Sequence, residues 1–159
     1  MLLHPLPHRD VIMVSACLWG EKTRYDGWAR PCPALRSRLA KEEIILICPE
    51  LAGGLAVPRS PAAFTGARPG REGYDLLAGR AGLINGEGQD VSRAFIDGAR
   101  KVLRLALAKK VELAYLKDRS PSCAFDPLGL NPRGGVRLGV LSALLTAHRI
   151  AVREVRGGD

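Results

Sequence analysis

Three cysteines in this sequence share one setting, because each ends or closely follows a short apolar run. Cys17 ends the first run and Cys48 ends the second, while Cys123 follows a third run after a Ser-Pro-Ser turn. Three thiolates around one point make a soft, anionic pocket that suits an iron–sulfur cluster, or a zinc ion with one open position. A single buried cysteine is usually just a small hydrophobic residue, but three in matching positions favour a metal site.

The apolar runs predict buried parallel strands, since they are rich in β-branched residues and apolar on both faces. Pro49 ends the second strand, because proline has no N–H to donate to a neighbouring strand. In open α/β sheets ligands bind at the carboxyl ends of the strands, so the three cysteines are expected to meet at that edge. The predicted strands span residues 11–17, 44–48, 111–117 and 150–155.

The alternation of strands and helices predicts an α/β fold, a single-domain, three-layer, Rossmann-like open sheet that is mainly parallel. Predicted helices span residues 33–42, from a cap at Asp90 or Ser92 to about residue 109, and 136–149. Residues 1–10 are predicted to form a loose leader, and residues 11–159 are predicted to form a single domain. The segment 51–89 is too long for a passive linker, so it predicts an active-site loop or lid, with a hairpin near residues 74–84.

The formal net charge of +8 suggests an anionic partner such as a nucleotide or RNA, with a merely basic surface as the alternative. No apolar run is long enough to cross a bilayer, and the N-terminus does not resemble a signal peptide. We therefore expect no membrane partner, a cytoplasmic location and reduced thiols. The four cysteines match no CxxC zinc pattern, and Cys32, in a loop before the first helix, is expected not to be a ligand.

Other polar residues near the cysteines could act on a substrate. Glu50, two residues after Cys48, is a candidate general acid or base, and a solvent-facing loop glutamate is the alternative. Ser120 and Ser122 flank a proline beside Cys123. Either hydroxyl could bind substrate or relay a proton, although turn chemistry alone also explains serines there.

Loops that leave the same sheet edge carry candidate substrate-binding residues. Arg24, Tyr25 and Asp26 combine a cation, an aromatic ring and a carboxylate, which could bind a planar anionic ligand such as a pyrimidine nucleotide. A surface turn is the alternative. Arg24 and Arg59 are the leading candidates to hold a substrate phosphate, because a guanidinium can donate two parallel hydrogen bonds to it. Internal salt bridges with Asp26 or Glu50 are the alternative role for the two arginines.

Several ordered motifs between residues 11 and 155 resemble the thiouracil desulfidase family, which was long known only as a domain of unknown function. The resemblance implies an oxygen-sensitive [4Fe-4S] cluster on Cys17, Cys48 and Cys123 with one open iron site. It also implies that Glu50 is the catalytic acid or base and that the catalytic serine lies in 120–122. The motifs are Val14-Ser15-Ala16-Cys17-Leu18-x-Gly20, Arg24-Tyr25-Asp26-Gly27, Cys48-Pro49-Glu50-x-x-Gly53-Gly54-Leu55, Pro58-Arg59-x-Pro61, Gly88-x-Asp90-Val91-Ser92, Phe95-x-x-Gly98-Ala99, Leu116-Lys117-x-Arg119-Ser120-Pro121-Ser122-Cys123 and Gly135-Val136.

The chemistry that this resemblance implies is hydrolytic, non-redox removal of sulfur from thiolated pyrimidines such as 2-thiouracil, 4-thiouracil or 4-thiouridine monophosphate, with release of hydrogen sulfide. A free base or nucleotide is favoured over tRNA, because the chain lacks the second domain of the relatives that act on tRNA. The sequence departs from the family pattern at Thr23, at Ala124 and in the segment 126–129, which bears on the exact substrate.

A cluster protein with a sulfur-transfer or RNA-desulfidase role is one alternative to this assignment, and two other classes of function also compete with it. One is a non-enzymatic zinc or iron–sulfur module that binds RNA or nucleotides through its positive charge. The other is a cysteine hydrolase with Cys48 or Cys123 as the nucleophile, which lacks an obvious histidine partner in the sequence. The colour of the anaerobic protein separates a cluster from zinc, since zinc proteins are colourless.

Overall fold

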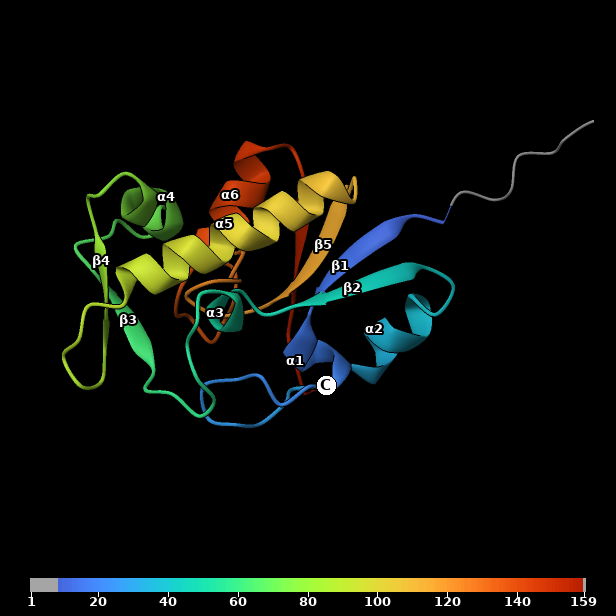
Figure 1. Ribbon diagram of the computed structural model, residues 1–159, viewed down its shortest axis with the longest axis horizontal. Helices are drawn as coiled ribbons and strands as arrows, with labels where there is room; N and C mark the ends of the chain where they lie inside the picture. Colours follow the sequence, from blue (N-terminus) through green and yellow to red (C-terminus); the bar gives the residue numbers. More distant parts are fainter. Residues whose placement is uncertain (1–8, 159) are drawn as a thin grey trace, which may run out of the picture.

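A four-stranded parallel sheet, in the order β2-β1-β5-β6, forms the centre of the computed structural model, which describes residues 9–158 (Figure 1). The strands are aligned in register, with Val11 paired to Glu43 and Leu113 paired to Ala151. Their carboxyl ends therefore share one edge, and the predicted α/β class with a mainly parallel sheet is confirmed. Residues 1–8 of the predicted leader lie outside the described residues. The strands are β1 (Val11–Ser15), β2 (Glu43–Ile47), β5 (Leu113–Lys117) and β6 (Ala151–Val155).

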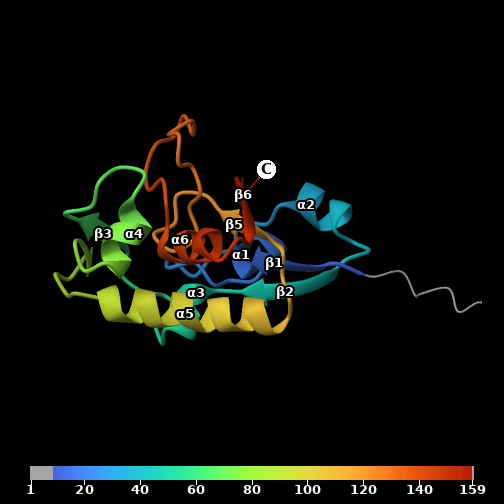
Figure 2. The same cartoon turned by 90° about the horizontal axis from the view of Figure 1, so that it is seen from above.

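Both faces of the sheet are apolar, because alternate residues of a strand point to opposite sides. Met13, Ala114 and Leu116 belong to the core beneath the helices α5 and α6. Ile12 and Val14 belong to a smaller core beneath the helices α1 and α2. Figure 2 shows α5 and α2 on different sides of the sheet, which gives the three predicted layers. These helices are α1 (Ala16–Trp19), α2 (Pro33–Arg38), α5 (Ser92–Ala108) and α6 (Val140–Ala147).

The long segment between β2 and α5 forms a second, two-stranded sheet. In it, β3 (Ala62–Thr65) pairs antiparallel with β4 (Gly82–Asn85), and the helix α4 (Glu72–Leu77) lies between them in the chain. The hairpin predicted near residues 74–84 is therefore wrong. Residues 74–77 are helical, and Gly79 ends this helix in the left-handed conformation, with a φ of +75°. The strand partner of β4 lies before α4 rather than within the predicted hairpin.

The boundaries of three helices differ from the predictions. The helix predicted from residue 136 begins only at Val140, because the backbones of Val136 and Leu138 form antiparallel bridges with residues 119 and 125. The helix predicted to end at residue 42 ends at Arg38 and gives way to a turn that leads into β2. At α5 the Asp90 carboxylate accepts the Ser92 N–H at 2.9 Å, while Val91 occupies the N-cap position. None of the described helices is long and apolar enough to span a membrane.

Candidate active site

A cavity of about 870 Å³ opens at the carboxyl ends of β1, β2 and β5. Its wall combines the thiols of all three predicted ligands with polar side chains from every loop that leaves this edge. The lining includes Cys17, Cys48, Cys123, Glu50, Ser120, Arg24, Tyr25 and Arg59. The parallel strands thus bring residues that are far apart in the sequence to one site, as the polarity of the strands predicts.

Cys17 lies on a helical turn rather than on a strand, because β1 ends at Ser15 and α1 begins at Ala16. The turn closes at Gly20, which has a φ of +109°, a conformation that glycine adopts without strain. The Cys17 carbonyl accepts the backbone N–H of Arg30 at 3.0 Å, so the loop 20–31 folds back against it. The Cys17 residue is only 8% exposed, at the base of the cavity.

Cys48 occupies the N-cap of α3 (Pro49–Ala52), one residue beyond the end of β2. The close approach of α3 to α5 fixes its position. A Cβ atom on Gly98 of α5 would lie 1.8 Å from the Pro49 carbonyl oxygen, and one on Gly53 would lie 2.0 Å from the Ala94 carbonyl oxygen. The two backbones therefore pack against each other through glycines, and both Cys48 and Glu50 depend on this contact.

Cys123 lies in a tight turn that α6 holds in place. Ser120 Oγ accepts the backbone N–H groups of Ser122 and Cys123, each at 3.1 Å. From α6, Ser142 Oγ donates to the Cys123 carbonyl at 2.8 Å. A Cβ on Gly139, just before α6, would lie 2.4 Å from the Ser122 carbonyl oxygen, so only glycine fits there. Ser120 is thus a turn-forming residue in this geometry.

Ionisation of the three thiols is unfavourable in the absence of a bound cation, because their surroundings raise their pKa values. Burial raises the pKa of Cys17 to about 11, and burial also raises the pKa of Cys48. Burial raises the pKa of Cys123 as well, and the negative charges of Cys17 and Cys48 raise it further. A hydrogen bond from Ser15 acts in the opposite direction on Cys123. Thiols that oppose one another's ionisation in this way suit a bound cationic group, which stabilises all three thiolates.

The chemistry of the three thiols decides which group they could hold. Among residues 9–158, no three Cys, His, Asp or Glu side chains are arranged to hold a single metal ion. Cys17, Cys48 and Cys123 line one cavity, and thiolates are the soft ligands that iron–sulfur clusters and zinc take. The donor set of these three residues therefore fits an iron–sulfur cluster.

Glu50 is held between a cation and a hydroxyl at the wall of the cavity. Its Oε1 accepts a hydrogen bond from Nε of Arg59 at 3.1 Å, and its Oε2 accepts one from the hydroxyl of Ser122 at 3.4 Å. The side chains of Glu50 and Arg59 are 14% and 9% exposed. Arg59 also donates to the carbonyls of Thr23 and Ala56, so each nitrogen of its guanidinium has an acceptor in the protein. Ser122 is fully buried.

Arg24 and Tyr25 line the cavity, whereas Asp26 is not among its lining residues. Arg24 donates to Asp26 through Nε at 3.2 Å and through Nη2 at 2.9 Å, and its guanidinium lies 5.7 Å from the centre of the Tyr25 ring. The hydrogen bonds from Arg24 hold the pKa of the Asp26 carboxyl below its usual value. Both arginines expected to bind phosphate are therefore engaged in internal ion pairs, and the substrate contacts of these residues stay predictions.

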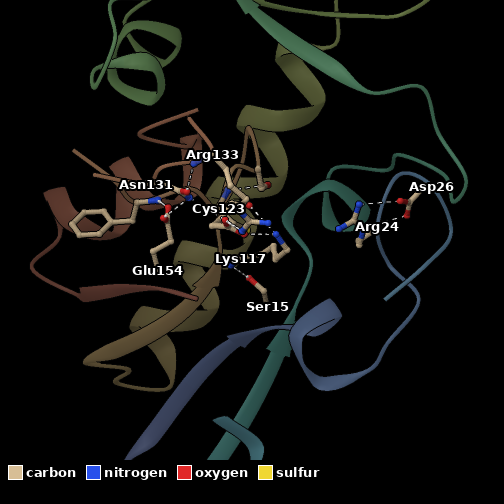
Figure 3. A network of polar contacts seen from close by, with 11 residues as sticks. Ser15, Arg24, Asp26, Lys117, Cys123, Asn131, Arg133 and Glu154 are labelled. Atoms are coloured by element: carbon tan, nitrogen blue, oxygen red, sulfur yellow. Dashed lines mark hydrogen bonds and ion pairs between the residues drawn. The ribbon is translucent and has the colours of Figure 1, made fainter. Parts of the chain in front are cut away.

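A second polar network at the same edge was not singled out from the sequence. Asp118, which is buried, forms ion pairs with Lys117 and Arg133, and it accepts the side-chain amide of Asn131 at 3.0 Å (Figure 3). The backbone N–H of Lys117 donates to Ser15 Oγ at 3.0 Å, which links β5 to β1. Residues 117–119 lie between the end of β5 and the turn that carries Cys123. The rule that ligands bind at the carboxyl ends of parallel strands could therefore have assigned them to the cavity.

The parallel sheet and the thiol-lined cavity at its strand ends define an α/β protein with one candidate site at that edge. The model of the family described as 2-thiouracil desulfurase matches residues 12–155, and the chain belongs to this family. The solved structure of the [4Fe-4S]-dependent thiouracil desulfidase TudS is similar, with a TM-score of 0.71 and 33% sequence identity over 92% of this chain and 91% of TudS. The uncharacterized protein YbbK of Bacillus subtilis (strain 168) is 33% identical over 138 residues, 85% of this chain and 89% of YbbK. The resemblance drawn from the sequence motifs is confirmed.

Proposed function

We propose that this protein is a [4Fe-4S]-dependent desulfidase that removes sulfur from thiolated pyrimidines of the 2-thiouracil, 4-thiouracil and 4-thiouridine monophosphate type. Cys17, Cys48 and Cys123 are the proposed ligands, which leaves one iron without a protein ligand. The observation that carries the proposal is the convergence of these three thiols with Glu50 in one cavity. Membership of the desulfurase family and similarity to TudS support the same assignment.

The proposed reaction exchanges sulfur for oxygen without a change of oxidation state. Water adds its oxygen to the ring carbon that bears the sulfur, the carbon–sulfur bond breaks, and both protons of the water end on the sulfur as hydrogen sulfide. When bound, a cluster with an open iron supplies a Lewis acid for the thiocarbonyl sulfur. No electron donor is needed, because the two bonds to sulfur are replaced by two bonds to oxygen.

Glu50 is the proposed general base for the attacking water and the proposed acid for the leaving sulfur. Arg59 orients the carboxylate by binding Oε1, so Oε2 faces Ser122 at 3.4 Å. Ser122 is therefore the better of the two serine candidates for proton transfer, since its hydroxyl donates to the acid–base residue. Ser120 has the separate role of forming the turn that carries Cys123.

Anaerobic purification and cluster reconstitution test the proposal directly. We expect brown protein that releases sulfide from 2-thiouracil, 4-thiouracil or 4-thiouridine monophosphate, with one oxygenated base formed per sulfide. Replacing Cys17, Cys48 or Cys123 with serine should lower bound iron and abolish sulfide release, whereas Cys32→Ser should retain both. Colourless, zinc-containing protein, or brown protein inactive on all three substrates, would contradict the proposal.

A further inference from the structure

We propose that Arg59 is a positioning residue that holds the segment 22–29 over the Cys48 thiol and so limits the access of small molecules in solvent to this thiol. The proposal concerns contacts between Arg59 and a loop, so it goes beyond the role of Arg59 as the partner of Glu50. Its extension to a bound cluster rests on the proposed function, whereas its test on the free thiols does not. Arg59, Cys48 and residues 23–25 line the same cavity.

The segment 22–29 is neither helix nor strand, and most of its hydrogen bonds are internal to it. On either side of it, the N–H groups of Glu21 and Arg30 donate to carbonyls of α1 at 3.1 and 3.0 Å. Within the segment, Arg24 and Asp26 pair with each other. Internal bonds fix the shape of the segment, but they do not fix its position against the rest of the protein.

Within residues 9–158, three hydrogen bonds attach the segment 22–29 to parts of the protein outside the loop 20–31. Arg59 supplies two of them, because its backbone N–H donates to the Tyr25 carbonyl at 2.8 Å and its Nη2 donates to the Thr23 carbonyl at 3.0 Å. The third is a long contact of 3.9 Å from the Cys48 thiol to the same Thr23 carbonyl. A cluster binds cysteine as the thiolate, which has no proton to donate, so Arg59 is then the source of both remaining bonds.

The Arg59 guanidinium is built into the protein. Its side chain is 9% exposed, and its three nitrogens donate to Glu50 Oε1 at 3.1 Å, to the Ala56 carbonyl at 3.2 Å and to the Thr23 carbonyl at 3.0 Å. Because the guanidinium is planar and rigid, its bond to Glu50 and its bond to Thr23 constrain each other. One side chain therefore positions both the acid–base carboxylate and the segment beside Cys48.

Cys48 is the least shielded of the three thiols at this site. Cys17 and Cys123 are buried, whereas Cys48 is only half-buried at the N-cap of α3. In the segment that contacts it, Tyr25 and Trp28 are exposed, so this part of the chain has solvent on one side and the cavity on the other. Movement of the segment away from α3 would therefore expose the Cys48 thiol before the other two.

Alkylation of the cluster-free protein tests the proposal, with iodoacetamide as the probe and mass spectrometry to assign each modified cysteine. The comparison is between Glu50→Gln and the double variant Glu50→Gln/Arg59→Gln, because neither leaves a buried carboxylate without its cation. Glu50→Gln keeps the bond from Arg59 to Thr23, so Cys48 should react at the wild-type rate. In the double variant Cys48 should react roughly tenfold faster, because loss of a hydrogen bond from a charged group shifts a local opening equilibrium by about that factor.

Internal controls separate access to Cys48 from unfolding and from charge. General loss of structure would expose Cys17 and Cys123 as well, whereas we expect both to react at their wild-type rates. Burial raises the pKa of Cys48 and the charge of Arg59 opposes that rise, so loss of the charge alone would slow the alkylation. Arg133→Gln removes another paired cation from the same cavity and makes no contact with the segment, so it should leave the Cys48 rate unchanged.

The cluster-loaded protein extends the test. Its visible absorbance should disappear in air roughly tenfold faster in the double variant than in Glu50→Gln. Arg59→Lys keeps the charge but cannot make the forked bonds, so its Cys48 should also react faster than that of the wild type. Wild-type reactivity of Cys48 in both Arg59 variants, or an equal rise at all three cysteines, would overturn the proposal. A protein that binds no cluster refutes the proposed function, while the alkylation rates still decide the role of Arg59.

Discussion

The hydroxyl of Ser122 donates a hydrogen bond of 3.4 Å to the carboxylate of Glu50, although 72 positions separate the two residues in the chain. Ser122 belongs to the turn after β5 and Glu50 to the first turn of α3 after β2, and β1 lies between these strands. The contact therefore exists only because three parallel strands end at one edge. It links the acid–base candidate to the turn that carries Cys123.

Glu50→Gln is predicted to separate proton transfer from cluster binding. The amide keeps the size of the carboxylate but cannot act as a base, and acid–base residues typically contribute about 10²–10⁴-fold to rate. We expect sulfide release to fall by that factor while iron content and the visible spectrum stay as in the wild type. Near-normal turnover with an unchanged spectrum would assign the base to another residue.

The two serines are predicted to fail in different ways. Ser122→Ala removes the donor to Glu50, so kcat should fall while bound iron is retained. Ser120→Ala leaves the N–H groups of Ser122 and Cys123 without their acceptor, so it should destabilise the turn by about 1–3 kcal/mol and lower the iron content. Iron analysis together with sulfide assays on both variants distinguishes the roles. Full iron content with no activity in Ser120→Ala would instead make Ser120 the reacting serine.

Gly98→Ala is predicted to disrupt the site from a distance. The new methyl group would collide with the Pro49 carbonyl, so α3 must move away from α5 and carry Cys48 and Glu50 with it. Overpacking of this kind costs about 1–3 kcal/mol. We expect lower stability in urea and less iron per chain after reconstitution, with Arg104→Ala on the exposed side of α5 as the control. Wild-type stability and iron content in Gly98→Ala would show that the helices can separate without consequence.

The strand pattern was enough to predict which residues meet at the sheet edge. Cys17, Cys48 and Glu50 lie within a few residues of strand ends, where the polarity of a parallel sheet fixes their location. The secondary structure of the segment 51–89 was harder to predict, because glycines and prolines occur both in the turns of hairpins and at the ends of short helices. The turn signals there do not reveal that α4 separates the two strands of the small sheet.

The interaction partners of the arginines could not be predicted from the sequence either. Arg24 and Arg59 are near the right loops, but whether a guanidinium faces a ligand or a carboxylate depends on packing between loops. Asp26 lies two residues from Arg24 and Glu50 nine residues from Arg59, and both pairs form. The loop that brings Arg133 to Asp118 has no regular pattern that predicts its path, so the network at this wall was visible only in three dimensions.

Asp118→Asn is predicted to loosen the loop that contains Arg133 and to do so in a pH-dependent way. Burial alone would raise the pKa of the Asp118 carboxyl, but the hydrogen bond and charge of Lys117, with Asn131 and Arg133, hold it below its ordinary value. A carboxyl with a depressed pKa in the folded state contributes stability above its unfolded pKa, and this contribution is lost as the pH falls through the lower folded value.

The free energy of unfolding of Asp118→Asn should therefore lie below that of the wild type by about 1–3 kcal/mol near neutral pH, because Lys117 and Arg133 lose their buried partner. The difference should stay constant down to about pH 5 and shrink below about pH 4, where the wild-type carboxyl becomes protonated as well. Urea unfolding across this range measures it, and Asp97→Asn, which removes the exposed partner of Arg93 on α5, is the matched control. A difference between the wild type and Asp118→Asn that persists unchanged into strong acid would mean that the Asp118 charge contributes nothing and that the variant acts through packing alone.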